Sequence, residues 1–406
     1  MALRAPHLYQ TLRNFCLGAF LALQREVEAG CELPFAFEEH PSLGAPALYE
    51  YRPLVRGFVE ERAHLLRAIP DAALAVEDLR REPSAAIFAR AHAGAGPTEE
   101  QAVFRTVLLP LVVATAEAGG GFDWHDDAFD RAYEELEKSL FGKHRAYAAV
   151  APLVGVSATQ LVELGGGVRI RHMVSGEISQ LWPEAQGLLP PEFGRAPDRL
   201  CVLELRVDLP QGEAEPPDAP GELADAVSAL RLATAGPIAA GPVLFERLDF
   251  RPLGIRPLLP IAGTQPAGEP TRLDSFRGGL AVDLRERLVL ADEDRELAEA
   301  LDRWELSLFA EEPFRTGQLT EALESLLGRG DGLWAAAVRA SLLLGETTQE
   351  RAELLERMRE RPRPDHVRRA LVETLMHGDR AGLVTALDEA LLGLRPRPTS
   401  VYSKAA

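Results

Sequence analysis

The sequence is poor in the residues that build covalent or metal-held frameworks. Its 406 residues include three cysteines, Cys16, Cys31 and Cys201, and none of them belongs to a Cys-x-x-Cys pair. Disulfide-rich domains and structural zinc sites both need cysteines in closely spaced sets. The sequence therefore argues against a disulfide framework and predicts no metal and no cofactor.

The sequence also lacks a clear membrane-crossing run. The most apolar stretch, 107–118, is shorter than the roughly 20 residues that a transmembrane helix needs. Arg13 and Arg25 interrupt the apolar run near the N-terminus, and no small-residue cleavage site follows it, so it does not resemble a signal peptide. We therefore expect a cytoplasmic protein without a membrane partner, in which 107–118 forms a buried helix.

Positive charge is scarce. The chain has 62 acidic and 44 basic residues, a formal net charge of −18, and its only lysines are Lys138, Lys143 and Lys404. Such a chain does not present the broad positive face that nonspecific duplex binding needs, although a local basic patch is compatible with an acidic body. The composition is otherwise that of a globular chain, with 46% hydrophobic residues, and the length allows two or three domains.

The first 118 residues and the segment after them have the apolar spacing of helices. Glycine and proline separate the helical stretches. Helices are expected over 9–30, 49–68, 72–81, 99–118 and 126–140. Asp123 is the expected N-cap of the last of these, which carries acids in its first turn.

Between about 145 and 290 the pattern changes to a period of two. Apolar and polar residues alternate over 168–173 and 201–209, which predicts strands, and Gly165–Gly167 is typical of a hairpin turn. Further strands are expected over 243–250 and 279–284, with a helix over 221–235 between them. The sequence therefore predicts a small mixed α/β middle domain.

The helical period returns from residue 292, and short links between helices favour an antiparallel bundle. Pro362 and Pro364 end one of these helices because proline lacks an amide donor. The predicted fold class is α+β. Its expected parts are a helical N-terminal region at 1–118, an α+β middle domain at 119–290, a helical bundle at 291–395 and a disordered tail at 396–406.

Several short segments of the bundle occur in a familiar order, which ends in Met-His-Gly. They are Trp304–Phe309, Leu319–Leu327, Ala337–Ala340, Leu342–Gly345 and Met376–Gly378. In this pattern the block resembles the HEPN superfamily, and most closely its ApeA-like branch. Upstream, Leu164–Arg171 and Leu230–Leu232 are similar to the region that precedes this domain in such proteins, so the likeness spans about residues 120–395.

The resemblance implies a helical bundle that often forms a homodimer. Active members of the family are metal-independent endoribonucleases of antiviral defence and toxin systems, with an arginine placed a few residues before a histidine. A histidine can move the proton of the RNA 2′-hydroxyl near neutral pH, and an arginine can stabilise charge on the phosphate. The resemblance implies His377 as the general acid/base.

The arginine of this motif is missing from its usual place. Counting back from His377 by the family's spacing leads to Ala370, Leu371 and Val372. The nearest arginine is Arg369, which on a continuous helix lies within about 80° of His377 but roughly 12 Å from it along the axis. Arg369 is the candidate phosphate partner. A second interpretation makes His377 a helix-terminal cation ahead of a glycine.

An arginine-rich connection precedes this helix. Its candidate RNA-binding residues are Arg357, Arg359, Arg361, Arg363, His366 and Arg368. Arg361 and His366 also have the family's literal spacing, but they lie in a proline-broken link. The connection is either a phosphate-binding patch for RNA or a solvated surface loop.

Two functions remain open on this evidence. The first is an ApeA-like HEPN protein of a bacterial defence or toxin type system, which binds or cleaves RNA. The second is a catalytically degenerate HEPN scaffold or dimerisation module, whose middle domain recognises a ligand or partner without cleavage.

Overall fold

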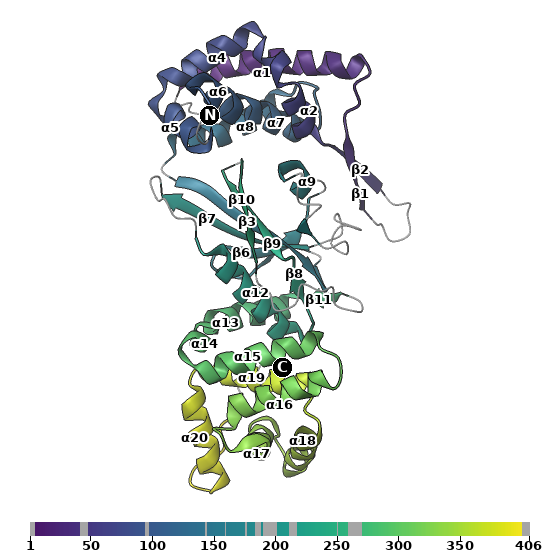
Figure 1. Ribbon diagram of the computed structural model, residues 1–406, viewed down its shortest axis with the longest axis vertical. Coiled ribbons are helices and arrows are strands. Elements are labelled where there is room, and N and C mark those ends of the chain that lie inside the picture. The colour runs from purple at the N-terminus through teal and green to yellow at the C-terminus, as the bar shows by residue number, and fades with distance from the viewer. Residues whose placement is uncertain are drawn as a thin grey trace.

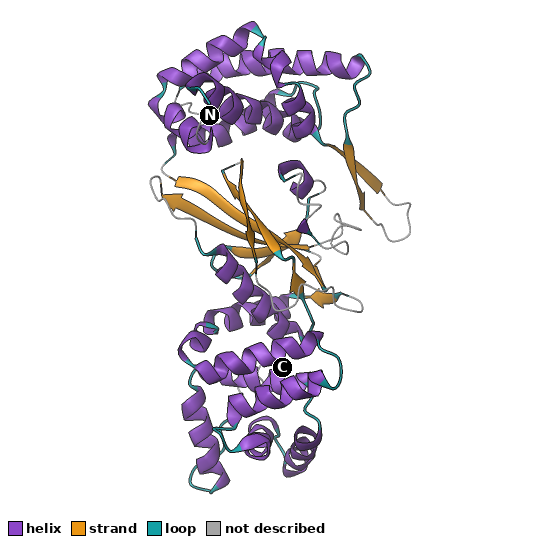
Figure 2. Ribbon diagram, in the orientation of Figure 1, coloured by secondary structure: helices purple, strands orange, loops and turns teal. Residues whose placement is uncertain are grey.

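The computed structural model describes residues 5–40, 48–93, 97–142, 144–158, 160–174, 177–182, 188–189, 201–210, 217–249, 251–258 and 270–399. Along the longest axis a helical N-terminal unit, a sheet and a helical C-terminal part follow one another (Figure 1). Colouring by secondary structure shows the strands gathered mainly in the middle (Figure 2). This arrangement confirms the expected α+β fold class.

The N-terminal unit is built around one long helix, α1 (Pro6–Glu28). Its buried side chains recur every three or four residues, so one face of the helix packs into the core. The other helices are α2 (Val55–Glu61), α3 (Ala63–Arg67), α4 (Pro70–Arg81), α5 (Pro83–Ala93), α6 (Glu99–Val103), η1 (Phe104–Leu108), α7 (Leu109–Gly119) and α8 (Asp126–Phe141).

A short hairpin interrupts this unit. β1 (Phe35–His40) pairs antiparallel with β2 (Leu48–Pro53). The single helix expected over 49–68 is therefore wrong in its first part, where the chain is a strand. Helical structure begins only at Val55, because Pro53 lacks an amide donor and the residue ahead of a proline disfavours the helical conformation.

The apolar helix expected over 107–118 lies in the interior. It belongs to a continuous helical run, Glu99–Gly119, that is 21 residues long and apolar enough to cross a membrane by length and composition alone. However, 72% of its most apolar window is buried inside the molecule. A run so largely covered by the protein's own side chains has the burial of a core helix.

The core of the N-terminal unit extends past residue 118. Phe129, Tyr133, Leu136 and Leu140 of α8 pack in the same buried cluster as α1 and α7. The first unit therefore ends near residue 142. The cap of α8 is His125 instead of the expected Asp123, and no side-chain hydrogen bond supports it.

The main sheet is antiparallel, with the order β10-β9-β3-β7-β6-β5, and β8 pairs with β3. Its strands are β3 (His144–Val154), β5 (Val162–Glu163), β6 (Val168–His172), β7 (Cys201–Pro210), β8 (Ala239–Ala240), β9 (Val243–Leu248) and β10 (Arg251–Pro257). A separate parallel pair joins β4 (Val156–Ala158) to β11 (Thr271–Leu273). The expected hairpin turn at Gly165–Gly167 is confirmed, since it joins β5 to β6.

The two faces of the sheet differ. One face carries Leu203 and Leu205 into a large apolar core beneath helix α12 (Ala219–Thr234). The other carries Val150, Val202 and Phe245 in a small apolar cluster with residues of the short helix α9 (Glu177–Leu181). On that second face the polar residues of β6, β7 and β9 come together.

The C-terminal part is entirely helical over the residues that the structure describes from 275 onward to 391. Its helices are α13 (Ser275–Arg287), α14 (Val289–Glu293), α15 (Arg295–Phe309), α16 (Phe314–Leu327), α17 (Gly332–Leu344), α18 (Thr348–Glu360), α19 (Pro364–His377) and α20 (Arg380–Leu391). The strand expected over 279–284 is wrong, because this segment belongs to α13. Asp274 caps that helix by accepting a hydrogen bond from the Arg277 amide, at 2.8 Å.

One hydrophobic core joins the sheet to the C-terminal helices. It runs from Tyr147 and Leu203, through α12 and α13, to Trp304 and Leu387. The expected boundary at residue 290 therefore crosses a continuous interior. Beyond α20, Arg397 donates to the backbone oxygen of Leu342, at 3.2 Å, so the start of the expected disordered tail contacts the bundle, whereas positions 400–406 lie outside the described residues.

Candidate functional site

His377 lies at the exposed C-terminal end of α19. Its Nδ1 lies 3.1 Å from the backbone oxygen of Asp379. Since a carbonyl oxygen only accepts, Nδ1 carries the proton in this contact, and the neutral ring leaves Nε2 as a base. The following Gly378 has a φ of +83° and closes the helix, so the position also suits a helix-terminal cation.

Arg369, the candidate phosphate partner, is directed elsewhere. Its Nη2 donates to the backbone oxygen of Leu344, 3.5 Å away at the end of α17. Among the described residues, no hydrogen bond or ion pair joins Arg369 to His377. The two side chains belong to one helix but make separate contacts.

The arginine-rich connection is largely neutralised by acids. Arg357 pairs with Glu353 (3.5 Å), Arg361 with Glu312 (2.7 Å) and Arg368 with Asp365 (3.0 Å). Arg368 also donates to the backbone oxygen of Leu232, at 2.9 Å, and so ties α19 to α12. Arg359 and Arg363 are exposed. The free positive charge here is smaller than the sequence suggests.

His366 is buried and does not face the surface with these arginines. Its side chain lies in α19 at 8% exposure, and its Nδ1 has no hydrogen-bond partner within the described part of the chain. Burial lowers the pKa of His366, so the ring is neutral near pH 7. The literal pair of Arg361 and His366 is therefore split between a surface ion pair and the interior.

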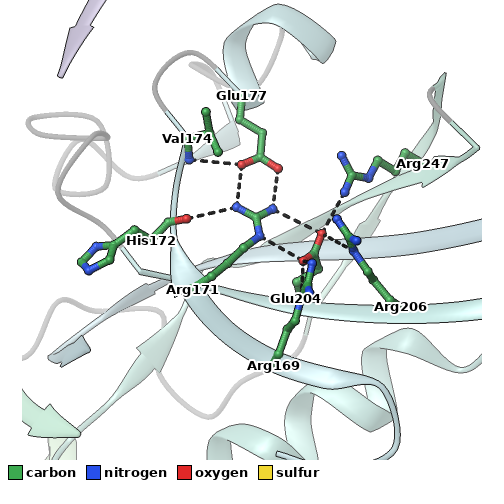
Figure 3. Close-up of polar contacts among 8 residues, drawn as sticks. All are labelled: Arg169, Arg171, His172, Val174, Glu177, Glu204, Arg206 and Arg247. Carbon is green, nitrogen blue, oxygen red and sulfur yellow. Dashed lines mark hydrogen bonds and ion pairs between the residues drawn. The ribbon is translucent and has the colours of Figure 1, made fainter. Parts of the chain in front are cut away.

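A second cluster of charge, which the sequence analysis did not single out, lies on the polar face of the sheet. Glu204 of β7 is fully buried, and the guanidinium groups of four arginines surround it (Figure 3). They are Arg169 (2.6 Å) and Arg171 (2.9 Å) of β6, Arg206 (3.2 Å) of β7 and Arg247 (2.8 Å) of β9. We call these residues, with Glu177, the arginine face.

The strand register explains why these residues meet. Arg169 stands opposite Glu204 in the β6–β7 pair. Arg206 and Arg247 stand on either side of Ala148, which belongs to the strand between them. Successive side chains of a strand alternate between faces, so residues at these positions project from the same side of the sheet.

Glu177 provides the second carboxylate. From α9 it accepts two hydrogen bonds from Arg171, at 2.6 and 2.8 Å, in the paired geometry typical of arginine and carboxylate (Figure 3). The backbone amide of Val174 donates to Glu177 at 3.3 Å. Within the cluster, four guanidinium groups therefore face two carboxylates. The groove beside Arg206 and Arg247 also carries the carboxylates of Glu135, Asp208 and Asp249.

The pKa of Glu204 records this environment. Burial raises the pKa of the carboxyl, but the hydrogen bonds and charges of Arg171, Arg169 and Arg206 outweigh burial and lower it to about 2. Burial lowers the pKa of Arg247 from its ordinary value, although Glu204 opposes the effect. Arg247 is therefore an incompletely compensated cation in a partly desolvated position.

A groove of about 850 Å³ opens beside the arginine face. The sheet contributes Arg206 and Arg247 to its lining, and α8 contributes Glu135 and Lys138. Arg206 and Lys138 are well exposed, with 53% and 70% of their side chains accessible, whereas Arg247 is 21% accessible. Asp249, also in the groove, has Arg145 beside it at 3.7 Å. The volume is in the range of small-molecule sites.

No family model, curated protein or solved structure matches this chain.

Proposed function

We propose that this protein is a binding module that takes a phosphate-bearing ligand of nucleotide size, such as a short RNA segment, at its arginine face. The observation that carries the proposal is the set of four arginines around the buried Glu204, two of which, Arg206 and Arg247, line a groove of about 850 Å³. The C-terminal helices form its scaffold, which suits the non-cleaving HEPN-like protein expected as one alternative.

The chemistry of the arginine face supports this ligand class. Guanidinium groups bind phosphate through two parallel N–H donors, and Glu204 holds Arg206 and Arg247 with only part of their donors. Because the carboxylates fix the side chains in advance, a ligand does not have to order them when it binds. Lys138 on the facing helix also lines the groove, and it is paired with Glu134 at 3.1 Å.

Binding without cleavage is favoured by the surroundings of His377. The arginine that would stabilise the phosphate, Arg369, contacts the backbone at Leu344. Three arginines of the arginine-rich connection are paired with acids, and the connection lies at the opposite end of α19 from His377. A metal-free cleavage site needs the proton-transfer group and the cation aimed at one phosphate.

The test measures binding of the full chain to ATP by calorimetry and to labelled single-stranded RNA by fluorescence anisotropy. Arg206→Gln removes one exposed cation of the groove and is expected to weaken binding roughly 10- to 100-fold, because a hydrogen bond to a charged group contributes about 1.5–3 kcal/mol. With RNA, losing one phosphate contact also reduces the slope of log affinity against log salt by about 0.7.

Two arginine variants serve as matched controls. Arg295→Gln removes an exposed arginine of α15 far along the chain from the groove and is expected to bind like wild type. Arg359→Gln tests the arginine-rich connection. The proposal is wrong if neither ligand binds, or if Arg359→Gln weakens binding while Arg206→Gln does not.

RNA cleavage at His377 is the second candidate function, and the contact between its Nδ1 and Asp379 favours it because Nε2 is left as an exposed base. If the protein cleaves RNA in the presence of EDTA, His377→Ala is expected to lower the rate about 10²- to 10⁴-fold, as for loss of a general base. Cleavage that survives His377→Ala, or no cleavage by wild type, removes this candidate.

A further inference from the structure

A second pocket lies on the side of the sheet opposite the arginine face, among α12, α14 and α15. Its volume is about 250 Å³. Its polar lining includes Asp225 and Arg231 from α12, Asp292 from α14, and Asp302 and Glu305 from α15. Apolar walls are provided by Val227, Leu258, Leu288 and Leu301.

The charges in this pocket are unbalanced. Four carboxylates and one guanidinium line it. That guanidinium, of Arg231, is itself buried and already engaged, since its Nη1 lies 3.0 Å from Glu305 Oε2 and its Nε donates to the backbone oxygen of Ile238 at 2.7 Å. The three aspartates are exposed at the opening and have no such cation inside the pocket.

Glu305 adds an observation that acidity alone would not supply. Its side chain is 4% exposed, and its Oε1 has no hydrogen-bond partner among the residues that the structure describes. An unpaired oxygen of a buried carboxylate costs about 1–3 kcal/mol or more, so such an atom normally has a donor. Glu305 lines the pocket, but Oε1 itself has less than 1 Å² of accessible surface, so a donor in the pocket satisfies it once the side chain turns toward that donor.

The titration of the rim agrees with this picture. Although Asp225 is exposed at the opening, it is partly desolvated, which raises its pKa, and the charge of Asp292 adds to the effect. Burial, followed by Glu299, raises the pKa of Asp302. Arg285 opposes the shift at Asp225, and Arg303 opposes it at Asp302, yet both pKa values remain above the ordinary one. A positive charge placed in the pocket would therefore stabilise the ionised forms of Asp225 and Asp302.

The shape of the pocket selects among cations. No group of three metal-ligating side chains lies close enough to hold a metal ion in the described part of the chain, so the carboxylates are too dispersed for one compact ion. A water molecule occupies about 30 Å³, which gives a pocket of this size room for roughly eight non-hydrogen atoms. Leucine and valine walls suit a hydrocarbon stem.

We propose that this pocket binds a short aliphatic diamine, with one ammonium group on Glu305 and the other at the aspartate rim. Butane-1,4-diamine is the probe, because four methylene groups separate its two ammonium groups and six non-hydrogen atoms fit the roughly eight that the pocket allows. The ligand differs in charge from the one proposed for the arginine face, so the two sites are tested separately.

The experiment is calorimetric titration of the full chain with butane-1,4-diamine, beside butan-1-ol and magnesium chloride at matched ionic strength. Saturable binding of the diamine alone is expected. Glu305→Gln should weaken it roughly 10- to 100-fold, because it removes a charge-assisted hydrogen bond. Asp302→Asn should weaken it about two- to fivefold, as for an exposed ion pair.

Two further variants keep the outcome decisive. Glu305→Gln also takes a charge from the buried Arg231, so its fold is checked by circular dichroism, and Asp225→Asn and Asp302→Asn carry the test if it unfolds. Glu286→Gln removes an equivalent charge from an exposed position of α13 outside the pocket and should bind like wild type. Equal binding of diamine by all variants, or none by wild type, overturns the proposal, and equal binding of magnesium shows a general counter-ion effect instead.

Discussion

At the residue scale, Glu204 holds the polar face of the sheet together. It is fully buried, and arginines from three strands pair with it. Its two oxygens therefore accept hydrogen bonds that water would otherwise accept from these guanidinium groups. Removing one partner of a buried ionic network is costly because it leaves the remaining charges unpaired. The stability of the protein should therefore depend on the charge of this one side chain.

The first prediction concerns acid unfolding. The pKa of Glu204 in the folded protein is lowered from 4.5 to about 2. Its contribution is therefore fully present above pH 4.5 and is lost as the pH falls through about 2. A shift of this size corresponds to about 3 kcal/mol. The free energy of unfolding, measured by urea titration between pH 6 and pH 2, is expected to fall across this window.

A glutamine substitution isolates the effect. Glu204→Gln should lower the free energy of unfolding by about 3–5 kcal/mol at pH 7 and flatten its dependence on pH below 4.5. Glu163→Gln, on the exposed edge strand β5, is the matched control and should change neither. An unchanged pH dependence in Glu204→Gln would contradict the assignment.

The sequence indicated four of the six residues of the arginine face. Alternation over 201–209 placed Glu204 with Arg206 on one face, and alternation over 168–173 placed Arg169 with Arg171. It could not show that the two strands pair in the register that sets Arg169 opposite Glu204, because register depends on packing between distant segments. The available signal was two arginines at alternate positions of β6, together with Glu204 and Arg206 at alternate positions of β7.

At the element scale, glycines and capping residues predicted the turns and the ends of helices better than hydrophobic period predicted whether a segment is a helix or a strand. The glycine turn between β5 and β6 and the end of α19 at Gly378 follow from residues that favour a positive φ. The segment 279–284 misled because three apolar positions fit either period, and the capping residue Asp274 decides for a helix. The hairpin of β1 and β2 was missed where aromatic and acidic residues fitted a helix equally well.

The turn supplies the second prediction. Gly167 has a φ of +79°, and a Cβ there would collide with the backbone oxygen of Arg206 in β7. Gly167→Ala is therefore expected to cost about 2 kcal/mol or more and to weaken ligand binding at the arginine face. Thermal unfolding and anisotropy measure the two effects.

A neighbouring glycine provides the control. Gly166 has a φ of +57°, and a Cβ there would meet the guanidinium of Arg285, a side-chain end that must shift from its hydrogen bond to Gly165, and the three atoms nearest to that Cβ all belong to this side chain. Gly166→Ala should cost only the strain of the left-handed conformation, about 1 kcal/mol, and leave ligand affinity unchanged. Equal losses in the two variants would mean that the β6–β7 pairing does not depend on this contact.

At the scale of the whole molecule, two large hydrophobic cores dominate the interior of the described residues. Residues up to about 142 enclose one core, and the sheet and C-terminal helices enclose the other. The two parts meet across the groove, with Arg145 beside His92 at 2.8 Å. The sequence predicted three parts because changes in hydrophobic period mark changes of secondary structure, and such changes need not coincide with changes of core.

The third prediction follows from this division. Scanning calorimetry of the full chain is expected to show two unfolding transitions, one for the N-terminal unit and one for the sheet with its helices. A fragment of residues 1–142 should fold alone, and a fragment of residues 291–395 should not, because it lacks the sheet that covers its apolar side. Three transitions, or a folded 291–395 fragment, would contradict it.

Trp304 makes the consequence concrete. Its ring is wholly enclosed, and its indole N–H donates to the backbone oxygen of Pro364 at 2.9 Å, deep within the interior that both the strands and the bundle line. A fusion protein that carries only the last hundred residues would therefore contain one side of this core and would expose its apolar surface to solvent. The sheet and the bundle therefore belong in one expressed fragment, because they share this core.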